Sequence, residues 1–277
     1  MTDKKGLDLL GIQPISSAID STVKKSLEGI EGFLQLVCKP ALGEIGLMAQ
    51  DQVRNWRLNN IIKMLNKAEG KLDFQNGKLE LKSHPRVAIS IIENSSLIDD
   101  DEIQEMWGGL FASSCTENGK DDENLIFSDI LKLLTNAQAK IIKYSVQNCR
   151  KILYPNGSVI GERIRLTGEE LVKLTDIENH HRIDRELDYL STIGLIDGGY
   201  SPSESELIAN INPTYLALSL FVKCEGYDKN PDDYFKDEMI TKGEVDEEER
   251  IEQKEKAEKE ALKRKQLAES KKAGNTV

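Results

Sequence analysis

The feature that most constrains this chain is the recurrence of apolar residues at helical spacing in its first half. Over residues 15–37 they recur every three or four positions, which is the period of one helix face and favours packing against a partner helix. Pro40 stops or bends this helix. A second helix is predicted over 41–71, with Trp56 and Leu65 on its apolar stripe. Both helices are expected to pack against protein rather than against a membrane surface.

The clearest amphipathic helix runs over 103–111, where apolar residues stand at i, i+3, i+4, i+7 and i+8. Ser96, Asp99 and Asp100 offer oxygens that suit the N-cap of this helix. The acidic run 99–102 would also suit a divalent cation, because hard cations take clustered carboxylates. Carboxylates in a first helical turn complement the positive end of the helix dipole, and we favour this second interpretation.

The second half of the chain mixes helices with short strands. Helices are predicted over 127–134, 137–149, 167–175, 180–192 and 213–223, and strands over 158–166, 193–196 and 207–211. Thr167 and Glu170 form a capping box, in which each side chain satisfies a free backbone donor near the other. Strand, helix, turn, helix and then a two-stranded hairpin is the order of a winged helix-turn-helix.

Shifts in composition divide the chain into four parts. Residues 116–124 are rich in Asp, Asn and Gly and mark a boundary, whereas 244–272 consists almost entirely of Glu, Lys, Arg, Ala and Gln. The predicted parts are a flexible N-terminus (1–14), a helical domain (15–120), a winged-helix-like domain (125–226) and a charged helical or disordered tail (227–277). The fold class is therefore mainly α: a long-helix bundle, then a winged helix-turn-helix-like α+β domain, then the tail. A partner-binding role is the alternative interpretation of the tail.

A winged helix suggests DNA binding, with 180–192 as the recognition helix and 201–205 as the wing. The candidate contact residues on that helix are His180, His181, Arg182 and Arg185. Charge argues against DNA, because residues 125–226 carry 11 basic and 13 acidic side chains. Glu204 and Glu206 stand at the wing tip, where a phosphate contact requires Lys or Arg. Protein contact is therefore placed ahead of DNA reading.

Composition limits where the protein acts. The net charge of -11 repels nucleic acid on average. The most apolar window, 32–49, is interrupted by Lys39, Pro40 and Glu44, whereas a membrane-spanning helix needs about 20 apolar residues. No membrane span is predicted, and contact with a membrane surface is disfavoured. The four cysteines include no CxxC pair and no signal peptide is evident, so we expect free thiols in a cytoplasmic protein.

No motif of a catalytic or cofactor-binding site occurs in the sequence. It lacks the phosphate loop GxxxxGK[ST], the dinucleotide fingerprint GxGxxG, the nucleophile elbow GxSxG and the zinc motif HExxH. The three histidines are His84, His180 and His181, and adjacent histidines on a helix point about 100° apart, which makes a shared metal difficult. We expect no enzyme activity, no cofactor and no metal.

Three segments carry a resemblance to a known family. The first contains Lys39 and Pro40 and continues to Trp56 between arginines, the second is Glu102 to Ala112 with Trp107 and Leu110, and the third is Phe127 to Leu134. Together they cover about residues 39–225 and resemble the abortive infection alpha proteins of bacteria, with the segment around Trp107 the most specific. Gly108 and Gly109 depart from the family pattern, and glycine loosens a helix by about 1 kcal/mol relative to Ala.

The resemblance implies defence against phage, in which an infected cell stops growing or dies before progeny emerge. It supplies no catalytic residues. The leading hypothesis is a non-enzymatic defence protein that binds a protein partner or a phage component, with homo-oligomers as a further option. The alternatives are a winged-helix transcriptional regulator that binds DNA and a membrane-perturbing effector that uses residues 32–49.

Overall fold

The computed structural model describes residues 29, 32–38, 52–72, 81–201 and 206–274. The predicted flexible N-terminus (1–14), Lys39 and Pro40 lie outside these residues. The labelled helices are α4 (Gln52–Lys71), α5 (Pro85–Ser95), α6 (Asp101–Ser113), α7 (Asn124–Leu131), α8 (Asn136–Asn148), α9 (Gly168–Thr175), α10 (His180–Thr192), α11 (Tyr215–Cys224), α12 (Pro231–Tyr234) and α13 (Lys242–Gly274). The strands are β1 (Lys82–Ser83), β2 (Cys115–Thr116), β3 (Lys151–Leu153), β4 (Val159–Gly161), β5 (Arg165–Thr167), β6 (Ile196–Tyr200), β7 (Ile208–Pro213) and β8 (Met239–Thr241). The prediction of a mainly helical chain with small sheets is confirmed.

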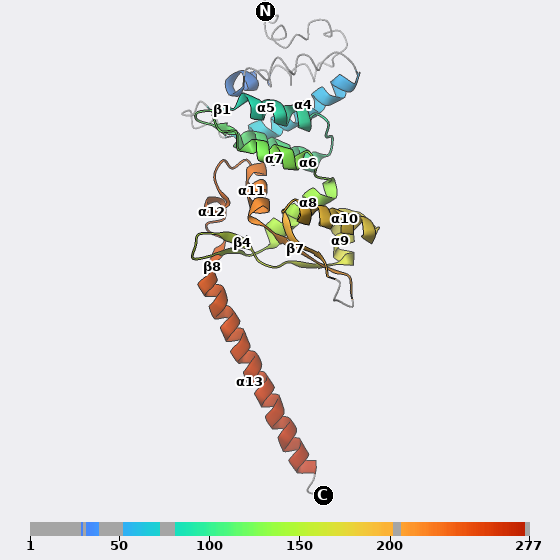
Figure 1. Cartoon of the computed structure of the whole chain (residues 1–277), viewed down its shortest axis with the longest axis vertical. Coiled ribbons are helices and arrows are strands. Elements are labelled where there is room, and N and C mark those ends of the chain that lie inside the picture. Colours follow the sequence, from blue (N-terminus) through green and yellow to red (C-terminus); the bar gives the residue numbers. More distant parts are fainter. Residues whose placement is uncertain (1–28, 30–31, 39–51, 73–80, 202–205, 275–277) are drawn as a thin grey trace, which may run out of the picture.

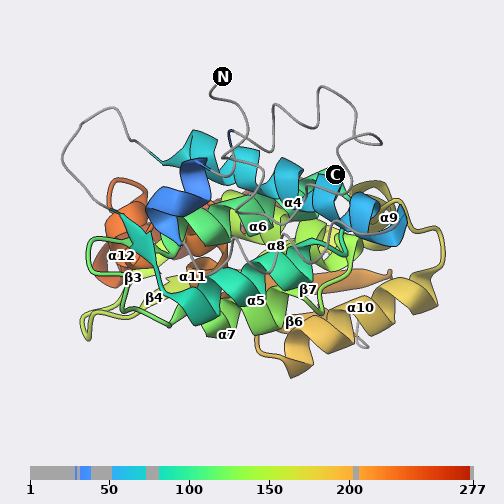
Figure 2. The same cartoon turned by 90° about the horizontal axis from the view of Figure 1, so that it is seen from above.

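The helices lie in layers, and α6 belongs to the middle layer (Figure 1). Helices α4 and α5 lie on one side of α6, α7 lies beside it, and α8 and α11 pack against it from the other side. Figure 2 looks down on the layer that contains α4 and α5, and it shows α10 at the margin of the molecule. The buried apolar residues of both halves form one continuous core, from Phe33 to Phe235. The boundary at 116–124 stays a prediction.

Two glycines allow α6 to lie unusually close to its neighbours. A Cβ atom on Gly109 would overlap the backbone carbonyl of Cys224 in α11. A Cβ on Gly108 would lie 2.8 Å from the Cβ of Lys67 in α4. Trp107, beside them, is fully buried. The glycines therefore do more than loosen the helix, since they permit close contact on both of its sides.

One residue of the apolar stripe predicted for the second helix, Trp56, does not face the core, so this part of the prediction was wrong. Trp56 is 40% exposed, whereas Leu58, Ile61 and Leu65 face the core. Asn60, which is also buried, donates from Nδ2 to the carbonyl of Ser96 at 3.0 Å, so a polar residue joins the inner face of α4. This hydrogen bond satisfies one donor of the buried amide, which makes a polar residue tolerable on the inner face of α4.

The strands form three small sheets. β1 pairs with β2, β3 lies between β4 and β8, and β7 lies between β5 and β6. The single strand predicted over 158–166 is divided between two sheets, because β4 and β5 have different partners. The predicted hairpin is present as β6 and β7, which pair antiparallel, but its first strand begins at Ile196 rather than Ile193 and continues to Tyr200.

Residues 227–241 carry more structure than the sequence indicated. Phe235 is buried and stacks on Phe221 with ring centroids 6.3 Å apart. The Nζ of Lys151 lies 4.5 Å from the centre of the Phe235 ring. Strand β8 then pairs with β3 in parallel, and α13 projects away from the body of the molecule (Figure 1). Of the two forms predicted for the charged tail, the exposed helix is the one observed.

We expect Gly109→Ala to lower the free energy of unfolding by about 3 kcal/mol or more, because the new methyl group would force α6 and α11 apart. Gly70→Ala is the matched control, since no atom lies within 4 Å of the added Cβ in α4. The control should leave stability unchanged or raise it by up to about 1 kcal/mol. Urea denaturation measures both, and equal stability of the two variants would contradict the close contact.

We expect the stabilising effect of Glu105 to depend on pH. Burial raises its pKa, but hydrogen bonds from Lys67 and Lys71 outweigh burial and hold the pKa below its ordinary value of 4.5. Its carboxylate lies 2.8 Å from the Nζ of Lys67 and 3.1 Å from that of Lys71. A lowered pKa stabilises the fold above pH 4.5, and this contribution is lost as pH falls through the folded value.

Glu105→Gln should therefore be less stable than the parent chain at pH 7, by no more than about 1 kcal/mol because the group is partly exposed. The difference should shrink below pH 4.5. Urea denaturation over a pH series measures it, and a difference that grows toward acid pH would refute the assignment.

Candidate interaction surface

The candidate contact residues lie on α10, whose position is set by its apolar side. Ile183, Leu187 and Leu190 are fully buried, as the predicted stripe requires. The side chain of Asn179 caps the helix and accepts from the backbone N–H of Arg182 at 3.2 Å. The four candidates predicted from the sequence, His180, His181, Arg182 and Arg185, are all exposed.

The four residues differ in their surroundings. The Nε of Arg182 lies 3.6 Å from the carboxylate of Glu186, which is itself only 8% exposed. Glu186 also accepts a hydrogen bond from the hydroxyl of Thr135 at 2.9 Å, so α10 is tied to the start of α8. Among the described residues, Arg185 has no ion pair. We call the exposed surface formed by His180, His181, Arg182 and Arg185 the α10 face.

A surface hollow of about 410 Å³ lies beside the α10 face. Its lining combines residues from the starts of α9 and α10 with residues at the start of β7: Thr167, Gly168, Glu169, His180, Glu206 and Leu207. His180 lines this hollow, and its Cε1 atom would lie 3.0 Å from a Cβ added to Gly168. Two carboxylates, one imidazole and the partly exposed Leu207 suit a basic or apolar side chain better than a phosphate. Most of the predicted wing, 201–205, lies outside the described residues.

Charges around the α10 face are mixed. Asp188 is exposed on α10 itself, one turn beyond Arg185, and Asp184 is partly exposed. Glu169 and Glu206 border the hollow. Two arginines among these carboxylates make no basic patch of the kind that follows a nucleic acid backbone.

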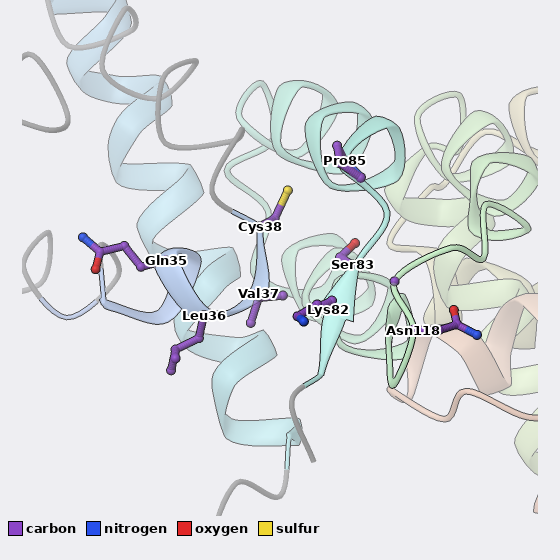
Figure 3. A pocket seen from close by; sticks show the side chains of 9 residues that line it. Gln35, Leu36, Val37, Cys38, Lys82, Ser83, Pro85 and Asn118 are labelled. Atoms are coloured by element: carbon purple, nitrogen blue, oxygen red, sulfur yellow. The ribbon is translucent and has the colours of Figure 1, made fainter.

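A second concavity, of about 300 Å³, lies on the helical layer (Figure 3). Its lining comes from three separate segments: Gln35, Leu36, Val37, Cys38, Lys82, Ser83, Pro85, Asn118 and Gly119. Leu36 is 69% exposed at its rim. The lining of this concavity is mostly apolar, and its residues include no Asp, Glu or His that could pair with Lys82 as an acid and a base.

The thiols are poorly suited to nucleophilic chemistry. All four cysteines are buried. Burial raises the pKa of Cys115 to about 12, and it also raises the pKa of Cys149 and of Cys224. A thiol that stays protonated near neutral pH is a weak nucleophile. Nor do the described residues bring together three His, Cys, Asp or Glu side chains in a group that suits a metal ion.

The residues that carry the family resemblance are mostly structural. Trp107 and Leu110 are fully buried in α6, and Glu102 pairs with Lys143 of α8 at 3.1 Å. Trp56 is partly exposed. The acidic run before α6 acts as predicted, because Asp100 caps the helix by accepting from the N–H groups of Glu102 and Ile103.

Comparison with known families decides the relationship. A family model described as abortive infection alpha matches residues 57–268. The chain belongs to the abortive infection alpha family. This confirms the resemblance and implies a role in phage defence. Neither the curated proteins nor the solved structures that were compared give a match. In the part of this abortive infection alpha protein that the structure describes, no helix is both long and apolar enough to cross a membrane.

The α10 face should tolerate substitution without unfolding. We expect Arg185→Glu to change the free energy of unfolding by less than about 0.5 kcal/mol, because the side chain is exposed and has no ion pair among the described residues. Thr135→Ala should cost about 1–2 kcal/mol, since Thr135 caps α8 and donates to buried Glu186. Thermal unfolding measures both. An Arg185 variant as unstable as the Thr135 variant would show that this arginine supports the fold.

Proposed function

We propose that this abortive infection alpha protein is a non-enzymatic phage-defence protein that binds a protein partner, from the host or the phage, through the α10 face. The observation that carries this proposal is the exposed, mixed-charge surface of His180, His181, Arg182 and Arg185 beside an acid-lined hollow. Arginine is enriched at protein–protein interfaces, and the rims of these interfaces are polar. The sequence supports contact over chemistry, because it lacks the catalytic motifs named above.

The scaffold of this surface is proposed to be a winged helix. Strands β3 and β4 follow α8, and the order β5, α9, α10, β6, β7 after them is the strand, helix, helix, hairpin order of that motif. The sheet order β5-β7-β6 agrees with it, because the first strand pairs with the last. In this arrangement α10 takes the place of the recognition helix, and the fold alone does not fix whether that helix contacts DNA or protein.

DNA reading is the second candidate, favoured only by that order of elements. Asp188 on α10 and Glu206 beside the hollow place negative charge where a duplex would approach.

A membrane effector has less support. Phe33, Leu34 and Val37, which belong to the apolar window proposed for it, are buried against protein. The remainder of that window, 39–49, lies outside the described residues.

A phage challenge with partner capture tests the proposal. Arg185→Glu should abolish protection and weaken capture of the partner from infected cells by about tenfold, equivalent to about 1.4 kcal/mol. Lys173→Glu is the matched control, because it makes the same charge change at an exposed position on α9. If both variants protect as well as the parent chain and capture the same partner, the α10 face is not the contact surface.

Binding to DNA, which the alternative function requires, is tested in a separate experiment. We expect the purified chain to show no binding to duplex DNA at low salt, because phosphate attraction is strongest there and the surface offers no basic patch. Fluorescence anisotropy with host and phage DNA measures this. Binding that weakens steeply with salt and is lost in Arg185→Glu would favour the transcriptional regulator instead.

A further inference from the structure

The start of helix α13, residues 241–248, is anchored by several contacts, and we call this segment the root. Thr241 and Glu244 form a reciprocal cap, in which the backbone N–H of Thr241 donates to Glu244 at 2.7 Å and that of Glu244 donates to the Thr241 hydroxyl at 3.3 Å. Val245 is buried against the body, only 4% exposed. Arg150 donates to Glu248 at 2.7 Å. The root therefore directs the helix outward from β8 at a fixed position.

Beyond the root the helix stands alone. From Asp246 to Lys263 every residue whose burial is described is exposed, including Ile251 at 49%. Its 33 residues span about 50 Å at 1.5 Å per residue, and Figure 1 shows it leaving the body. Packing normally supplies most helix stability, so a helix of this length without a neighbour has a surface free to pair.

Charge is segregated along α13. Residues 244–260 contain nine acidic and four basic side chains, whereas 261–274 contain one acidic and five basic. Residues 244–260, which we call the root half, are therefore net negative, and residues 261–274, the tip half, are net positive. The two halves are similar in length, so the helix is electrically complementary to a reversed copy of itself.

We propose that α13 pairs antiparallel with α13 of a second copy of this chain. In that arrangement each acidic root half lies beside the basic tip half of the other copy, and the two contacts are related by a two-fold axis. A parallel pair would place like charges together. The two bodies would lie at opposite ends of the pair, so they do not obstruct each other. This inference is independent of the α10 face.

The same charge pattern also complements the dipole of a single helix, and the experiment must separate the two explanations. Exposed ion pairs are individually weak and screened by salt, so the dimer should form at about 0.1 M salt and dissociate at about 1 M, where the Debye length falls from about 10 Å to about 3 Å. Sedimentation velocity of the full chain measures this.

Charge-reversed variants test the antiparallel register. A tip variant replaces Lys263, Lys265, Lys271 and Lys272 by Glu, and a root variant replaces Glu252, Glu255, Glu258 and Glu260 by Lys. The root variant leaves Glu248, which contacts Arg150, in place. Each variant alone should be monomeric, because both of its halves carry the same sign. Mixed together, the two should form a heterodimer.

A chain carrying both sets of substitutions separates pairing from the dipole effect. Its charges oppose the helix dipole but remain complementary to a reversed copy, so it should dimerise again. Circular dichroism shows whether α13 remains helical in each variant. A parent chain that is monomeric at both salt concentrations would overturn the proposal, as would a mixture of helical tip and root variants that stays monomeric.

Discussion

The close contact of α6 with α4 and α11 is the constraint on which the rest of the structure depends. Gly109 brings the backbone of α6 against the carbonyl of Cys224, and Gly108 brings it against Lys67. Because α11 follows β7 directly, this contact also fixes the sheet β5-β7-β6 relative to the helical layer. Helix α10 packs on β6, so the exposed α10 face is held in place by a contact on another helix.

Features with a local cause could be predicted from the sequence. The cap at Asp100 and the capping box of Thr167 and Glu170 each depend on residues two or three positions apart, and both are present. The exposure of the α10 candidates also followed from helical periodicity. Features that join distant residues had no such signal. These include the parallel pairing of β3 with β8, the hydrogen bond from Thr135 to Glu186, and the contact of Gly109 with Cys224. The exposure of Trp56 did not follow from the apolar period, because which part of a helix face is covered depends on residues far away in the sequence.

The proposed function rests on recognition through an exposed surface. Burial raises the pKa of Cys115, Cys149 and Cys224, and the hollow beside α10 combines carboxylates with a histidine and a leucine rather than with a basic cluster. Family membership supplies the biological setting, phage defence. The α10 face would then provide the recognition element and α13 a means of pairing two chains, which would present two such faces at once.

Site-specific photocrosslinking from position 181 in living cells tests the central claim most directly. A photoreactive residue replacing His181 should crosslink to a protein partner after phage infection, whereas the same residue replacing Lys173 on α9 should not. Crosslinks to nucleic acid from position 181, or equal protein crosslinks from both positions, would contradict recognition through the α10 face.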